Sequence, residues 1–81
     1  MDEASLLSTI TDLASKTTGR SDLDISAETD LIADDILDSL DWSVFLLDLE
    51  KHFDISIPDD LVEEHNLQVA GNLMRHIRET A

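Results

Sequence analysis

Asp38, Ser39 and Leu40 place a carboxylate, a hydroxyl and an apolar side chain together at the start of the strongest amphipathic run in the chain. A serine directly after a capping aspartate lies among backbone N–H groups that have no partner within the helix, near the positive end of the helix dipole. A phosphate ester is well tolerated at such a place. The position therefore predicts that Ser39 is a covalent attachment point.

The same tripeptide also suits an ordinary helix N-terminus. Asp and Ser are favoured cap residues, so Asp38 can accept from first-turn amides without any further chemistry. Asp41 stands where it completes something close to a capping box. Local chemistry leaves both interpretations open, and the surrounding sequence has to decide between them.

Two stretches around this serine match the pattern of a known family. The first spans residues 34–41 and reads DDILDSLD, and the second spans residues 47–60 and reads LDLEKHFDISIPDD. Together they resemble the acyl carrier protein family, in which the serine of Asp-Ser-Leu carries 4′-phosphopantetheine. The resemblance covers about residues 6–77 and is most specific from 34 to 60.

The resemblance implies a non-catalytic carrier with no catalytic residues of its own. A 4′-phosphopantetheine arm on Ser39 would supply a thiol, and an acyl or aminoacyl cargo would be held on it as a thioester. The implied partners are a phosphopantetheinyl transferase and an acyl- or aminoacyl-loading ligase or synthase with a basic docking patch.

Three positions depart from the family's pattern. Ile36 stands where carriers of fatty acid synthesis typically have a glycine, and apolar residues there are typical of aminoacyl and peptidyl carriers. Val44 replaces the usual acidic residue five positions after the serine, and Trp42 is uncommon three positions after it. These departures favour a dedicated carrier over the housekeeping carrier of fatty acid synthesis.

The outward face of the helix after Ser39 is the predicted partner surface. Its charged members offer electrostatic steering toward a basic partner, and its apolar members could enter a pocket on that partner. Leu47 could equally belong to the core. The full predicted set is Asp38, Leu40, Asp41, Val44, Leu47 and Asp48.

Composition limits the classes of function. The 81 residues include 19 acidic and 5 basic side chains, which gives a formal net charge of −14. This charge argues against nucleic-acid binding, because Lys and Arg are needed to neutralise the phosphates of a nucleic acid. From residue 28 to residue 64 there are thirteen acidic residues and a single fixed cation, Lys51, although such a segment can also be no more than a solvated face. The chain has no cysteine, so thiol chemistry must come from a cofactor.

No basic N-terminal stretch and no long apolar run marks a signal peptide or a membrane span. We therefore expect a soluble, cytoplasmic protein with no membrane span, and a monomer.

Hydrophobic periodicity predicts an all-α protein, a small four-helix bundle of three longer helices and one short third helix with a long first loop, in which residues 1–81 form a single domain. Helix one should stop at Gly19 in a left-handed conformation. Residues 20–37 then form a long connection whose apolar residues pack inward, namely Leu23, Ile25, Leu31 and Ile32.

The second helix is predicted from about Ser39 to about Phe53, and its buried stripe is Trp42, Phe45, Leu46, Leu49 and Phe53. Pro58 should be the first residue of the short third helix, which runs through about residue 65. The last helix should begin near residue 68, with Val69, Ala70, Leu73 and Ile77 on one face.

Other chemistries find little support. His52, His65 and His76 lack metal-ligand spacing and are interpreted as surface residues, so no metal site is predicted. Ser39 lacks the flanking glycines of a hydrolase nucleophile, and no EF-hand loop is present. One alternative stays open: an acidic helical protein–protein interaction module with no prosthetic group, in which Ser39 only caps its helix.

Overall fold

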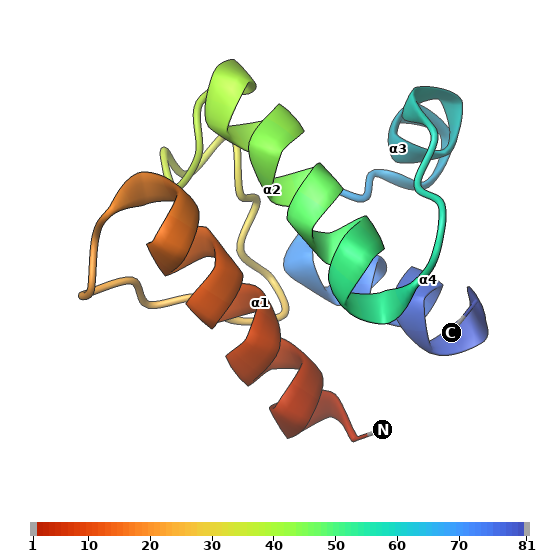
Figure 1. The fold of residues 1–81 in the computed structure, drawn as a ribbon, viewed down its shortest axis with the longest axis horizontal. Helices are drawn as coiled ribbons and strands as arrows, with labels where there is room; N and C mark the ends of the chain where they lie inside the picture. The colour runs from red at the N-terminus through yellow and green to blue at the C-terminus, as the bar shows by residue number, and fades with distance from the viewer. Residues whose placement is uncertain (1, 81) are drawn as a thin grey trace.

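Four helices joined by one long and two short connections make up the computed structural model, which describes residues 2–80 (Figure 1). Their bounds are Glu3–Thr18 for α1, Ser39–Phe53 for α2, Asp59–His65 for α3 and Ala70–Thr80 for α4. The described residues form no strand beyond one isolated antiparallel bridge between Asp30 and Val69. The predicted four-helix bundle with a short third helix is confirmed.

Local sequence sets both ends of α1. The Asp2 carboxylate accepts a hydrogen bond of 2.7 Å from the Ser5 amide, and this bond holds the pKa of Asp2 below its usual value. At the other end Gly19 adopts φ 74°, and its N–H donates to the Ser15 carbonyl. The predicted left-handed stop is confirmed.

The core lies where α1, α2 and α4 meet. Figure 1 shows α1 and α2 side by side and running in opposite directions, and α1 also contacts α4. Helix α3 buries no side chain completely, and it contributes only Leu61 and Val62 to the edge of the core. The buried residues are Leu6, Ile10, Ala14, Ile25, Leu31, Leu37, Phe45, Leu46, Leu49, Ile57, Leu67, Ala70, Leu73, Met74 and Ile77.

The long connection is held to the head of α4 by backbone hydrogen bonds. The amides of Ala70 and Gly71 donate to the carbonyls of Thr29 and Ala27, at 2.9 and 2.7 Å. The Leu31 amide donates in turn to the Gln68 carbonyl at 2.7 Å. The first amides of α4 are therefore satisfied by another segment of the chain rather than by a side-chain cap.

Burial within this connection differs from the prediction at one residue. Ile25 and Leu31 are buried and Leu23 is partly buried, as expected, but Ile32 is 36% exposed. Asp30 explains the difference, since its carboxylate accepts from the amides of Ile32 and Ala33 and turns the chain there. This turn leaves Ile32 at the surface.

Three predictions on helices α2 and α3 need correction. Trp42 and Phe53 are only half-buried because they occupy the first and last turns of α2, beyond the middle of the core. Pro58 is the N-cap of α3 rather than its first residue.

Helix α4 begins at Ala70, later than predicted, because the preceding residues pair with the long connection. Val69 is half-buried as a result. His76 is also half-buried, and its Nε2 atom is buried without a hydrogen-bond partner among the described residues, so the surface interpretation was wrong there. Within residues 2–80, no helix has the length and apolar character needed to cross a membrane.

Candidate functional site

Ser39 is the first residue of α2 and is exposed. Asp38 caps the helix with φ −87° and ψ −178°, and its Oδ1 accepts a 2.8 Å hydrogen bond from the Asp41 amide. The first helical bond runs from the Trp42 amide to the Asp38 carbonyl, also at 2.8 Å. The amides of Ser39 and Leu40 thus precede the first bonded turn and are free to face an anion.

The predicted cap is confirmed, but the capping box is only half formed. Within residues 2–80 the Asp41 carboxylate makes no return hydrogen bond to the Asp38 amide, and the Ser39 hydroxyl has no hydrogen-bond partner either. The Ser39 carbonyl accepts from the Ser43 hydroxyl at 3.4 Å. The Ser39 hydroxyl is therefore exposed and uncommitted.

Helix α2 also carries an exposed apolar strip. Leu40 is 74% exposed, Leu47 is 56% exposed and Val44 is 44% exposed. The sequence left open whether Leu47 lies in the core or at the surface, and in the structure it lies at the surface. Large apolar side chains exposed on one face of a small domain are typical of a contact surface.

The acidic residues predicted to flank this strip are not equally accessible. Asp38 is exposed, whereas Asp41 and Asp48 are half-buried. Glu50, lower on α2, is also half-buried, and its Oε2 accepts a 2.7 Å hydrogen bond from the Ile57 amide. Glu50 therefore holds the connection to α3 and is not part of the exposed strip.

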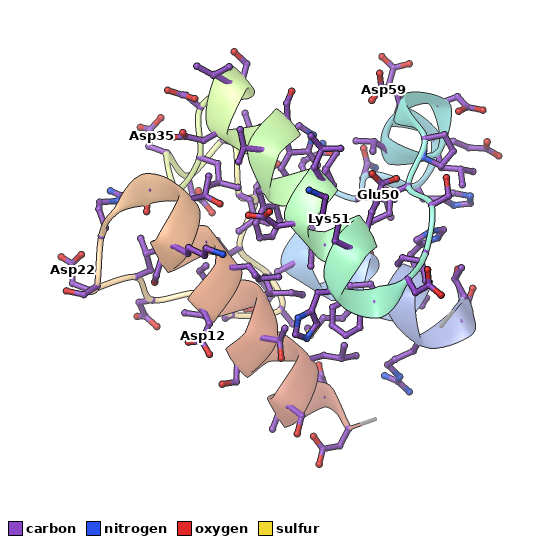
Figure 2. All side chains as sticks on the ribbon, viewed as in Figure 1. Asp12, Asp22, Asp35, Glu50, Lys51 and Asp59 are labelled. Carbon is purple, nitrogen blue, oxygen red and sulfur yellow. The ribbon has the colours of Figure 1, made fainter. Side chains whose placement is uncertain are left out.

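Carboxylates point outward around much of the bundle. Figure 2 shows Asp12 and Asp22 on the α1 side, Asp35 near the start of α2, and Asp59 at the start of α3. Among residues 2–80, no three His, Asp or Glu side chains are grouped so that they could hold a metal ion. The labelled carboxylates lie on different elements and are spread over the surface.

The turn before Ser39 is held on one side by the core. Asp35 adopts φ 59°, which is unusual for a residue with a Cβ, and its amide donates to the Ile32 carbonyl at 3.1 Å. Leu37 is buried, and its amide donates to the Leu31 carbonyl at 2.8 Å. These contacts fix the direction in which the chain enters α2.

Arg20 is a residue of this region that sequence reasoning missed. Its Nη2 donates to the carbonyls of Ile36 at 2.8 Å and Asp35 at 3.2 Å. Arg20 lines a surface hollow with Asp35, Asp38 and Asp41. One signal was available in the sequence, since Arg20 is the only lysine or arginine between residues 17 and 50.

A second hollow lies beside α2, where Trp42 is half-buried. Ile32, Ala33 and Val62 line it together with Trp42, so its wall is largely apolar. The Trp42 and Phe45 rings lie 5.8 Å apart between centroids. Trp42 therefore lies between this surface hollow and the buried Phe45.

Taken together, the fold and this site define a small acidic helical domain that presents one uncommitted serine at a helix N-terminus. The chain matches the family model described as the phosphopantetheine attachment site over residues 8–77, and it belongs to this family. Domains of the family carry a 4′-phosphopantetheine prosthetic group and are generally non-catalytic carriers. No solved structure matches the chain.

Proposed function

We propose that Ser39 is the residue that receives the 4′-phosphopantetheine arm, and that the chain carries an acyl or aminoacyl group on it as a thioester. The observation that carries the proposal is the exposed Ser39 hydroxyl at the start of α2 in a chain of this family. Two other serines differ from Ser39, since the Ser43 hydroxyl donates to the Ser39 carbonyl and the Ser26 hydroxyl pairs with that of Thr29.

Attachment is a phosphoryl-type transfer from coenzyme A. The Ser39 oxygen attacks the phosphorus that bears the pantetheine arm, the pyrophosphate P–O bond breaks, and adenosine 3′,5′-bisphosphate leaves. The hydroxyl proton passes to a base on the transferase or to solvent. The uncommitted amides of Ser39 and Leu40 and the helix dipole suit the phosphodiester that results.

Once attached, the arm supplies the thiol that this cysteine-free chain lacks. Partner enzymes dock on α2, where Leu40, Val44 and Leu47 supply apolar contact. Asp38, Asp41 and Asp48 supply steering charge, and Asp38 is the most accessible of the three. Val44, in place of the family's usual acidic residue, supports a dedicated loading enzyme with an apolar pocket.

The test is intact-protein mass spectrometry after incubation with coenzyme A and a phosphopantetheinyl transferase. The wild type and Ser43→Ala should each gain one arm, whereas Ser39→Ala should gain none. Ser43 lies one turn further along α2 and is also exposed, so Ser43→Ala controls for loss of a hydroxyl from this helix. An arm on Ser39→Ala would place the attachment site elsewhere.

The exposed apolar strip also suits the alternative function, an acidic interaction module whose serine is only a helix residue. The same measurement separates the two functions. A folded wild type that no transferase modifies would favour the interaction module.

A further inference from the structure

Arg20 contacts the turn that precedes the proposed attachment residue, although it belongs to the opposite end of the long connection. It follows Gly19, the C-cap of α1, and its amide donates to the Thr18 hydroxyl at 3.2 Å. From there its guanidinium reaches the carbonyls of Asp35 and Ile36. The two ends of the connection are therefore joined by one side chain.

The carbonyls that accept from Arg20 belong to the turn that positions Ser39. Asp35 has the left-handed backbone conformation, which must be held by its surroundings because a residue with a Cβ does not favour it. The core holds this turn through Leu37. On the solvent side, the donor that the structure provides is Arg20.

Charge adds to the effect of these hydrogen bonds. Three acidic residues, Asp35, Asp38 and Asp41, line the same hollow as Arg20. A guanidinium among them reduces their mutual repulsion, and hydrogen bonds from a charged donor are stronger than those from a neutral one. Loss of Arg20 would therefore loosen the turn and also raise the repulsion at the start of α2.

We propose that Arg20 is a positioning residue for arm attachment, holding residues 35–37 so that Ser39 is presented in the geometry that the transferase binds. This inference rests on the proposed function of Ser39. Arg20 acts through the turn and does not touch the reacting atoms. When only a fraction of molecules has the competent turn, the apparent affinity falls to that fraction of its intrinsic value, while the bound complex reacts as before.

The test compares Arg20→Met, Arg20→Lys and Arg78→Met as substrates of a phosphopantetheinyl transferase with coenzyme A. Arg20→Met keeps side-chain length but removes the donor and the charge, and it should raise KM for the protein about three- to tenfold with kcat changed less than about twofold. Arg20→Lys restores a charged donor and should recover part of the lost affinity. Arg78 is exposed on α4, so Arg78→Met controls for net charge and should stay within about twofold of wild type.

A second measurement does not depend on the arm. Hydrogen exchange of the Asp35 and Leu37 amides should be at least about threefold faster in Arg20→Met, while exchange of core amides such as that of Leu73 stays unchanged. Wild-type KM in Arg20→Met, or an equal rise in Arg78→Met, would overturn the positioning role. A wild type that is never modified would instead refute the proposed function of Ser39.

Discussion

Helices α2 and α4 use their apolar residues in different ways. Every large apolar side chain of α4 is buried, namely Leu73, Met74 and Ile77. Helix α2 buries Phe45, Leu46 and Leu49 but exposes Leu40, Val44 and Leu47.

The comparison separates a helix that only builds the fold from one that also keeps apolar side chains at the surface. An amphipathic helix whose single apolar face is buried has no apolar surface left for recognition. Helix α2 has apolar residues on two faces, and the second face begins beside Ser39. Exposed apolar surface favours association, so a small domain retains it where contact with another molecule is useful.

The largest effect should separate the two faces of α2. Leu49→Ala, in the core, should lower the free energy of unfolding by about 2–5 kcal/mol, and Leu73→Ala on α4 should cost a similar amount. Leu47→Ala removes the same atoms from an exposed site and should change stability by no more than about 0.5 kcal/mol. Urea denaturation measures all three. A loss of about 2 kcal/mol or more in Leu47→Ala would put that residue in the core and remove the contrast.

A smaller effect is expected at the head of α4. A Cβ on Gly71 would lie 2.7 Å from the Ala27 carbonyl oxygen, and this oxygen also accepts a hydrogen bond from the Gly71 amide. Gly71→Ala should therefore destabilise the protein by about 1–3 kcal/mol, although alanine is the better helix former by about 1 kcal/mol. Thermal unfolding decides the sign. Increased stability would mean that the connection does not pack closely on α4.

The smallest effect concerns His76, a half-buried polar side chain of α4. The Nε2 atom of His76 is buried with no partner among the described residues, and such a group weakens a fold. His76→Leu should leave the free energy of unfolding unchanged or raise it by up to about 1 kcal/mol. His65→Leu, at the exposed end of α3, is the matched control. A marked loss of stability in His76→Leu alone would show that the imidazole has a favourable role in the core.

Features set by neighbouring residues could be predicted from the sequence. The cap at Asp38, the bounds of α2 and the stop at Gly19 each depend on a few residues close together in the chain. The same holds for Ser39, whose position at a helix start follows from the pattern around it. Local rules therefore gave the ends of α1 and α2 and the place of Ser39 at a helix start, whereas its interpretation as an attachment residue came from the family resemblance.

Features set by distant contacts could not be predicted from the sequence. The exposure of Ile32 depends on the turn made by Asp30, and the start of α4 depends on carbonyls of the long connection. The link from Arg20 to the turn at Asp35 needs three-dimensional contacts that no periodicity encodes. The burial of His76 Nε2 without a hydrogen-bond partner could not be predicted either, since tertiary packing decides which atoms of a helix are covered.

The hydrogen bonds between the long connection and α4 also bear on the order of folding. They join residues 27–31 to residues 68–71, so they form only after distant parts of the chain have met, and closing such a loop is slower than winding a local helix. The turn before Ser39 is joined to this pairing, because the Leu37 amide donates to the Leu31 carbonyl and the Leu31 amide donates to the Gln68 carbonyl. A chain cut before residue 68 would therefore lack part of the support for the start of α2.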